Sequence, residues 1–271
     1  MSSIEKSADP NLDLILNRLA DSGDAQKYRK SFLIRRIDHR MRAKGIRTYQ
    51  EYAKLLSNDP VEHATLTSLF SVTVTEFFRD IQLFHLLRTT LLPSMVHSNR
   101  ITKIWCAGCA TGEEPYSVAL VASELLQTMP GSHRLSVFAT DINPNSIRFA
   151  RSGIYEERNL KNISDEIKSK YFQQVTGKKS WQISPQIREA IIFNVGDLAK
   201  VAPPASDLDM ILCRNVMIYF DKESRERLLK KFYDALKPKG YLIMGQSEIM
   251  IGRTSSLFKT IYTRERVYQK S

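Results

Sequence analysis

The segment Ile104–Ser117, IWCAGCATGEEPYS, holds the residues whose types and spacing most clearly suggest chemistry. An apolar stretch typical of a strand leads into a turn with glycines at 108 and 112, and a helical pattern with two adjacent carboxylates follows. Glycines let a backbone approach a ligand closely, but the third glycine and the spacing of the dinucleotide-binding pattern GxGxxG are missing. The segment therefore predicts a nucleotide-like cofactor other than NAD.

The adjacent Glu113 and Glu114 narrow the choice of cofactor. The dipole and free N–H groups of a helix N-terminus favour a pyrophosphate, and two carboxylates in the same turn would repel it. A cationic sulfonium cofactor with an amino group suits them, which favours S-adenosylmethionine (SAM). Acidic residues also favour the positive end of any helix, so this pair alone leaves a purely structural role open.

Composition and charge exclude several classes of protein. The chain has 271 residues, 42% hydrophobic and 25% charged, which is typical of an ordinary globular protein with one large or two modest domains. No apolar run approaches the roughly 20 residues of a membrane helix and no targeting pattern stands at the start, so we expect a cytoplasmic protein without membrane insertion. Cys106 and Cys109 lack further ligands, and no metal site is expected. The net charge of +11 predicts an acidic partner.

The apolar pattern changes along the chain. Residues 1–92 have helical periodicity, and residues 93–100 are the candidate linker. Strand and helix patterns alternate over residues 101–271, which predicts an α/β domain with a parallel sheet wrapped by helices. Residues of about 155–191 are too many for a simple crossover and predict an inserted small β-subdomain with a hairpin turn near residues 176–178. The final stretches LFKTIYTR and RVYQK predict an antiparallel hairpin.

Polar residues follow three of the predicted strands. Asp141 ends the strand RLSVFATD, where a doubly wound fold places an acid against ribose hydroxyls, although Asp141 or Asn143 could instead cap the next helix. Because ligands of open parallel sheets bind at the carboxyl ends of strands, we expect these polar groups to converge. The other residues expected at this edge are Asp197, Leu198, Arg214 and Asn215. Leu198 is equally suited to the core and to stacking on adenine.

The segment Thr73–Asp80, TVTEFFRD, ends the helical region. Its two phenylalanines are typical of a buried helix face. Arg79 is less easily explained, because a guanidinium on an apolar turn is costly unless it meets a carboxylate, which its planar fork binds with two hydrogen bonds. Arg79 is therefore a candidate functional residue.

The segment 27–47 is crowded with Lys and Arg, and its sole acid is Asp38. On a helical wheel Leu33, Ile34, Ile37 and Met41 fall on one side and the basic residues on the other, which predicts a basic amphipathic helix. Such a face is either solvated or a docking surface for an acidic partner. The candidate docking residues are Arg36, His39, Arg40 and Arg42.

The chain resembles the chemotaxis receptor methyltransferases, the CheR-type protein-glutamate O-methyltransferases, in four motifs that occur in order. The motifs are TVTEFFRD, ATGEEPYS, FATDINPNSIRFARSGIY and the long segment from CRNVMIYF to GQSE. The resemblance covers the chain from about Lys27 onward. It implies methyl transfer from SAM to glutamate side chains in the cytoplasmic helical region of chemoreceptors, giving γ-methyl esters and S-adenosylhomocysteine. It also implies a Rossmann-like SAM-dependent methyltransferase sheet with an inserted small β-subdomain, preceded by a small all-helical domain.

Matching the motifs residue by residue implies a set of site residues. The residues implied at the cofactor are Thr73, Thr75, Arg79, Glu114, Asp141, Asp197, Leu198, Arg214 and Asn215. Arg79 and Tyr219 are the candidates for orienting the reacting groups, although Tyr219 could also be a packing residue between strand and helix. Thr73 and Asp197 stand where many members of the family have Asn, and both can still form hydrogen bonds.

Three further expectations follow from the resemblance. Some relatives bind a receptor's C-terminal peptide as an added strand of the β-subdomain, but the turn TGKKSW is short, so we expect this chain not to need that tether. A methyltransferase acting on the amino groups of nucleic-acid bases typically carries [DNS]PP[YFW] after the fourth strand, where this chain has RNVMIYF, so no nucleic-acid substrate is expected. A non-catalytic module that retains the fold is the other alternative, and the intact set of site residues argues against it.

Overall fold

The computed structural model describes residues 9–21, 23, 25–71, 74–98, 100–130, 133–250 and 252–271. The chain forms two compact units, Met1–Val72 with Tyr219–Arg225 and Thr73–Ile218 with Glu226–Ser271. Residues 93–100, which the sequence suggests as a linker, fall inside the larger unit, where most of them belong to helix α6 (Leu92–Ser98). The division between the units instead comes after residue 72.

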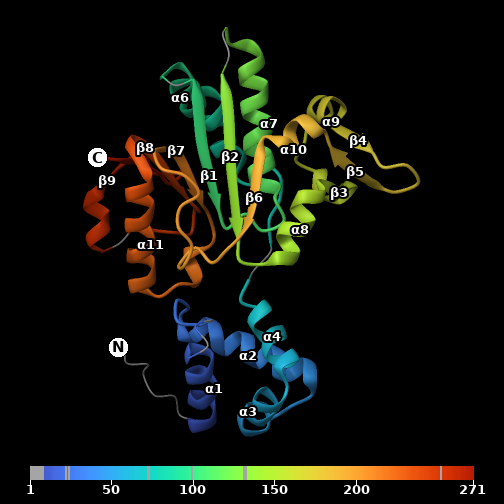
Figure 1. Ribbon diagram of the computed structural model, residues 1–271, viewed down its shortest axis with the longest axis vertical. Coiled ribbons are helices and arrows are strands. Elements are labelled where there is room, and N and C mark those ends of the chain that lie inside the picture. Colours follow the sequence, from blue (N-terminus) through green and yellow to red (C-terminus); the bar gives the residue numbers. More distant parts are fainter. Residues whose placement is uncertain are drawn as a thin grey trace. The chain divides into compact units, whose positions relative to one another are not determined.

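The smaller unit is helical, as the apolar periodicity predicts (Figure 1). Its helices are α1 (Pro10–Asp21), α2 (Lys30–Lys44), α3 (Tyr49–Asn58) and α4 (Pro60–Ser68). Their ends follow from local sequence, because Thr48 accepts a hydrogen bond from a free N–H at the start of α3 and Asp59 does the same for α4. Gly45 ends α2 in the left-handed conformation, with φ 69°. The expected apolar side of α2 is buried at Leu33, Ile37 and Met41.

The larger unit is built on a seven-stranded sheet with the order β6-β2-β1-β7-β8-β10-β9. Its strands are β1 (Ile101–Ala107), β2 (Arg134–Asp141), β6 (Ile191–Val195), β7 (Leu208–Cys213), β8 (Leu236–Met244), β9 (Phe258–Tyr262) and β10 (Val267–Lys270). The pairings from β6 to β8 are parallel, and β10 pairs antiparallel with both β8 and β9. The sequence predictions of a parallel sheet and of a closing antiparallel hairpin are both confirmed.

Helices cover both faces of this sheet. The helices of the larger unit are α5 (Ile81–Leu86), α6, α7 (Glu113–Thr128), α8 (Pro144–Ser152), α9 (Asp165–Tyr171), α10 (Pro185–Glu189) and α11 (Lys222–Ala235), with the π-helix η1 (Leu87–Leu91) between α5 and α6. Of these, α9 packs against the second, smaller sheet described below and not against this one (Figure 1). Ile104 and Cys106 of β1 join the core that includes α7, whereas Trp105 between them faces Phe232 of α11, with ring centroids 5.4 Å apart. Strand β7 is buried along its whole length and is apolar except at Asp209, whose buried carboxylate accepts the N–H of Lys103 at 2.7 Å.

A second, three-stranded antiparallel sheet lies in the chain between α8 and β6. Its strands are β3 (Ile154–Glu156), β4 (Phe172–Gln174) and β5 (Ser180–Ile183), in the order β3-β5-β4. The turn between β4 and β5 contains Gly177 in the left-handed conformation, with φ 73°. The inserted small β-subdomain predicted from the sequence is therefore present, and its extent of 154 to 183 is close to the one expected.

Candidate active site

The order of the strands reverses between β1 and β7, so the loops after β1, β2 and β7 meet at one edge of the large sheet. The loop after β1 is fastened to β2, because the N–H groups of Gly108 and Cys109 donate to the carbonyl of Thr140 at 2.7 and 3.1 Å. Open α/β sheets bind their ligands in this kind of crevice. The candidate site is therefore built by loops that the sheet itself holds in place.

Asp141 ends β2 and organises the loop after β1. One carboxylate oxygen accepts the N–H of Ala110 at 2.8 Å, and the other accepts the N–H of Asn143 at 2.9 Å. Asn143, and not Asp141, caps helix α8, since its side chain accepts the N–H groups of Asn145 and Ser146. Asp141 thus connects the loop after β1 with the start of α8.

The two glycines of the loop make room for the protein's own side chains. A Cβ on Gly108 would lie 2.3 Å from Val216 Cγ2, and a Cβ on Gly112 would lie 2.8 Å from the Cβ of Ala150. Both glycines also have positive φ, 90° and 97°, which other residues rarely adopt. Val216 therefore packs where a side chain of residue 108 would lie, and Ala150 packs where one of residue 112 would lie. The two glycines thus determine the conformation and packing of the loop.

The two carboxylates at the start of α7 have different surroundings. Glu113 is 2% exposed and accepts a hydrogen bond from the Thr111 hydroxyl at 2.7 Å. Glu114 faces Arg214, with Oε2 2.9 Å from Nη1, and its side chain is 13% exposed. Burial raises the pKa of the Glu114 carboxyl, and the charges of Arg214 and Arg79 oppose that rise. Glu114 is therefore the carboxylate that lies among the other candidate residues.

Arg214 joins two segments of the larger unit that are far apart in sequence. Its guanidinium, only 3% exposed, forms ion pairs with both Glu114 and Asp80, and Nη2 also donates to the carbonyl of Arg79 at 3.2 Å. Two carboxylates and a carbonyl thus compensate a charge that would otherwise be costly to bury. The contacts bring the TVTEFFRD segment beside the start of α7.

The turn that carries Arg79 has an unusual backbone. Phe78 and Asp80, on either side of it, both have positive φ, 52° and 63°. Such a conformation costs free energy in a bulky residue and persists only where neighbouring contacts hold it, and the N–H of Phe78 donates to the hydroxyl of Ser117 at 2.9 Å. Arg79 is half-buried, and its Nη1 donates to the carbonyl of Val74 at 3.2 Å.

The remaining cofactor candidates occupy different environments. Thr75 is half-buried, and Thr73 lies outside the described residues. Asp197 accepts the N–H of Ala199 at 2.9 Å in the turn after β6, and Leu198 is buried, with 6% of its surface exposed. Asn215 follows Arg214 in the left-handed conformation, with φ 59°. Asp197, Leu198 and Asn215 come after the ends of β6 and β7, from which the sequence predicts a site, whereas Thr75 lies between α4 and α5.

Tyr219 belongs to the smaller unit. Its ring centroid is 4.8 Å from that of Phe32 in α2, and its carbonyl accepts the N–H of Arg29 at 2.9 Å. The described contacts of Tyr219 are therefore those of a residue packed against α2, which is the packing role that the sequence left open.

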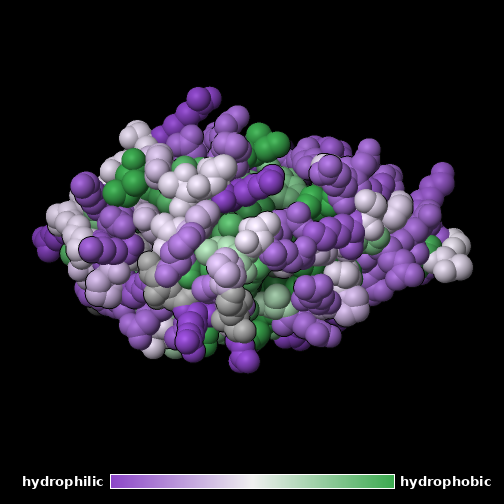
Figure 2. Space-filling model, turned by 90° about the horizontal axis from the view of Figure 1, so that it is seen from above, coloured by the Kyte–Doolittle hydropathy of each residue, from purple (hydrophilic) through white to green (hydrophobic). Residues whose placement is uncertain are grey.

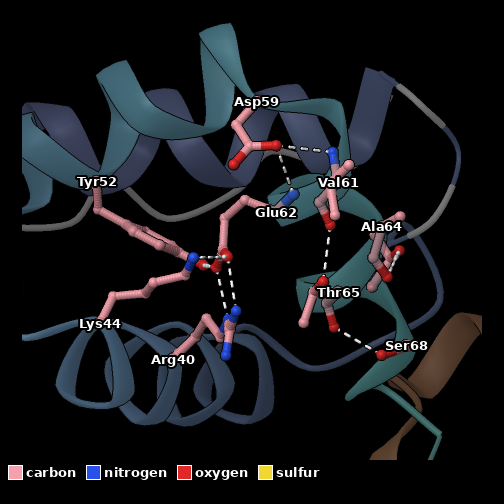
Figure 3. A network of polar contacts seen from close by, with 10 residues as sticks. Arg40, Lys44, Tyr52, Asp59, Val61, Glu62, Ala64, Thr65 and Ser68 are labelled. Carbon is pink, nitrogen blue, oxygen red and sulfur yellow. Dashed lines mark hydrogen bonds and ion pairs between the residues drawn. The ribbon is translucent and has the colours of Figure 1, made fainter.

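The four candidate docking residues of α2 differ in their exposure and in their contacts within the smaller unit. His39 and Arg42 are exposed, and Arg36 lies over the ring of Phe32, 5.1 Å from its centroid. Arg40 instead forms a bidentate ion pair with Glu62 of α4, at 2.6 and 2.7 Å (Figure 3). Arg40 is thus a structural contact of the smaller unit, which reduces the docking surface expected from the sequence.

Glu62 is the centre of a buried polar network in the smaller unit. It is 1% exposed and also meets Lys44 at 3.2 Å and the hydroxyl of Tyr52 at 3.0 Å, as Figure 3 shows. Burial acts to raise the pKa of the Glu62 carboxyl, but the hydrogen bonds from Arg40, Lys44 and Tyr52 outweigh it and leave that pKa below its usual value of 4.5.

The sequence matches two models of one protein family. Residues 73–267 match the model of the family described as "CheR methyltransferase, SAM binding domain", and residues 24–71 match "CheR methyltransferase, all-alpha domain". The chain belongs to the CheR methyltransferase family. It is a SAM-dependent methyltransferase. The all-alpha match lies within the smaller unit, and the SAM-binding match lies within the larger unit except for residues 219–225, which belong to the smaller one.

The relatives of this CheR-family chain include proteins named for chemotaxis. It is 33% identical to the chemotaxis protein methyltransferase of Borreliella burgdorferi over 83% of this chain and 82% of that one. It is also 33% identical to the chemotaxis protein methyltransferase of Escherichia coli, over 82% of this chain and 77% of that one. A 104.1 kDa protein of Rhodobacter capsulatus is 31% identical over 95% of this chain, which spans 27% of that longer protein.

Two further observations concern the apolar character of the helices and of the surface. Among the residues that the structure describes, no helix combines the length and the apolar character needed to cross a membrane. The face seen in Figure 2 is mostly hydrophilic, and hydrophobic side chains show chiefly in its middle.

Several contacts of the site concern residues to which the sequence interpretation gave no role. Asp80 pairs with Arg214, Ser117 holds the turn at Phe78, and Glu248 binds the loop after β7. All three stand inside motifs that carry the family resemblance, which was the available signal. What the motifs do not reveal is which residue each one touches.

Proposed function

We propose that this CheR-family methyltransferase methylates glutamate side chains in the cytoplasmic helical region of chemoreceptors, giving γ-methyl esters. The family and its relatives named for chemotaxis support the reaction class and the pathway. The observation that carries the choice of SAM as the cofactor is the placement of Glu114, beside Arg214 and near Arg79, at the carboxyl edge of the sheet. A carboxylate there suits a cationic cofactor and disfavours a phosphate.

The residues at this edge are chemically suited to hold SAM. Only one oxygen of Glu114 is used by Arg214, so the other can accept a hydrogen bond from the amino group of the cofactor. Asp141 would hold the ribose hydroxyls, and Asp197 with Leu198 would lie by the adenine. SAM, when bound, supplies a methyl group on a cationic sulfur that reacts with nucleophiles.

The residues of this chain contribute mainly position and the exclusion of water. A glutamate side chain is ionised at neutral pH and is already nucleophilic, so the site needs no strong base. Arg79 uses one N–H for Val74, and a guanidinium has further donors that can orient a carboxylate. Its hold must be moderate, because tight binding of the charged ground state would slow the loss of that charge in the reaction.

The exposed part of α2 supports an acidic partner. His39 and Arg42 are exposed, Arg36 is half-buried on Phe32, and the net charge of the chain is +11. We propose that these residues dock on the methylation region of the receptor in the cytoplasm, without membrane insertion and without a C-terminal receptor peptide as tether. Tight binding of such a peptide to the protein in calorimetry would contradict the last point.

Labelling separates this proposal from its alternatives. The protein is incubated with methyl-labelled SAM, receptor-containing membranes and, separately, DNA or RNA. Label on the receptor that mild base releases as methanol indicates a carboxyl methyl ester. Base-stable label on nucleic acid would instead indicate a nucleic-acid methyltransferase, and an unlabelled receptor in a sample that binds SAM would indicate a non-catalytic module.

A further inference from the structure

Glu248, in the turn after β8, is a buried carboxylate surrounded by backbone donors. It is 3% exposed and accepts the N–H groups of Gly245 at 2.7 Å, Asn215 at 3.0 Å, Val216 at 3.1 Å and Met217 at 2.7 Å. An unpartnered carboxylate at this depth would be very costly, and the four donors compensate it. Burial raises the pKa of the Glu248 carboxyl, and the four hydrogen bonds oppose that rise.

Three of the four donors are consecutive residues in the loop after β7. Successive N–H groups that converge after a left-handed residue form a concave anion site, and here Asn215 is the left-handed residue, with φ 59°. The chain's own carboxylate fills this site. Gly245 permits the close approach, because a Cβ there would lie 2.8 Å from the Asn215 nitrogen and 2.9 Å from Glu248 Oε2. The shape of the loop is therefore set by Glu248.

The same loop also contacts the glycine loop after β1. Val216, whose N–H binds Glu248, extends its side chain into the space at Gly108, where a Cβ would lie 2.3 Å from its Cγ2. The glycine loop continues to Ala110, whose N–H binds Asp141. A chain of direct contacts thus leads from Glu248, through Val216, to the loop that Asp141 holds.

We propose that Glu248 is a positioning residue for SAM binding: its carboxylate sets the conformation of residues 215–217 and thereby the packing of Val216 on the glycine loop. The inference rests on the proposed placement of the cofactor at this edge of the sheet. It does not depend on which substrate receives the methyl group, because its test measures SAM binding. A protein that binds SAM but leaves receptors unmethylated would contradict the proposed substrate and leave this inference intact.

The test is Glu248→Gln, which keeps the shape of the side chain but replaces one acceptor oxygen by an NH₂ group. Donors that now face an NH₂ group lose their acceptor, and the loop must rearrange. In calorimetry we expect the dissociation constant for SAM to rise by about 10- to 100-fold. Hydrogen exchange at the amides of residues 215–217 should accelerate in the free protein, which reports the loop directly.

The matched control is Glu62→Gln, because Glu62 is equally buried but belongs to the smaller unit. That variant should lose stability and keep the SAM affinity of the wild type. Val216→Ala provides a second test that leaves the carboxylate and its donors in place, and it should also weaken SAM binding. The effects of Glu248→Gln and Val216→Ala should combine less than additively, because they act along one chain of contacts.

A purely structural role for Glu248 predicts a different result. Glu248→Gln would then lower the melting temperature while its SAM dissociation constant stayed within about 2-fold of the wild type, a change well below one tenfold step of affinity. That outcome overturns the proposal. If Glu248→Gln does not fold, Val216→Ala decides: weaker SAM binding supports the proposal, and unchanged binding in a folded protein refutes it.

Discussion

Glu114→Gln and Asp80→Asn form a matched pair of substitutions, because each removes one of the two carboxylates that face the buried Arg214. Both replacements keep the shape of the side chain and leave Arg214 with one ionised partner. A hydrogen bond to a charged group contributes about 1.5–3 kcal/mol. We therefore expect either variant to lower the free energy of unfolding of the larger unit by about this amount in urea titrations.

The two variants should differ in SAM affinity. Glu114 is proposed to hold the amino group of SAM, and loss of that charged hydrogen bond corresponds to a rise of roughly 10- to 100-fold in the dissociation constant. Asp80 is not proposed to touch the cofactor, so Asp80→Asn should change the constant by less than about 3-fold, which is under half of one tenfold step in free energy. Calorimetry with SAM on folded protein measures both.

The pH dependence provides an independent check of the same residue. SAM's amino group requires the ionised form of Glu114, and burial raises the pKa of that carboxyl above its usual 4.5. Wild-type affinity should therefore fall as the pH decreases through this raised pKa, and Glu114→Gln should lack that step. Equal losses of affinity in the two variants, or unchanged affinity in Glu114→Gln, would refute the reasoning.

Three further predictions concern the rest of the molecule. Glu62→Gln should destabilise the smaller unit by about 1.5–3 kcal/mol. The pKa of the Glu62 carboxyl is lowered in the folded protein, so the stability that this carboxyl contributes is fully present above pH 4.5, the usual pKa of a glutamate. That stability is lost as the pH falls through the lower pKa of the folded state. Unfolding free energies measured across acid pH should therefore show a decrease that Glu62→Gln lacks. Gly108→Ala should destabilise the larger unit for two reasons: the new Cβ would clash with Val216, and the φ of 90° is unfavourable for alanine. Adding Val216→Ala should restore only the stability lost to the clash, and thermal unfolding of the single and double variants measures this. Arg42→Glu should raise KM for the receptor without changing the SAM dissociation constant, whereas Arg40→Ala should mainly lower stability. An Arg42→Glu variant with an unchanged KM, or an Arg40→Ala variant with a raised KM and an unchanged melting temperature, would contradict the docking surface.

The sequence predicts the sheet well because its strands have strong local signals. β1 and β2 begin and end at the residues expected, since an apolar run bounded by a turn determines each one. The inserted small β-subdomain and the last hairpin could be predicted equally well, because turn residues separate short β-rich stretches. The boundary between the two units could not be predicted, since helix α6 continues the helical pattern past residue 72 although it belongs to the larger unit.

The candidate site was predictable as a location in the fold but only partly as a set of contacts. Strand ends indicate where Asp141 and Arg214 lie, because the topology of a parallel sheet brings those ends together. The partner of Arg40 was not predictable, because Glu62 lies on another helix and nothing in the local pattern connects them. The contact of Glu248 with the loop after β7 likewise depends on the pairing of β7 with β8, a feature of the tertiary structure.

The most direct test of the central claim is the site of methylation on a receptor. The protein is incubated with SAM and the cytoplasmic helical region of a chemoreceptor, and the receptor peptides are analysed by mass spectrometry before and after mild base. We predict a mass gain of one methylene on glutamate side chains, which base removes and which Glu→Gln replacements in the receptor abolish. A receptor that gains no methyl group from protein that binds SAM, or a base-stable methyl group on another residue type, would contradict the claim.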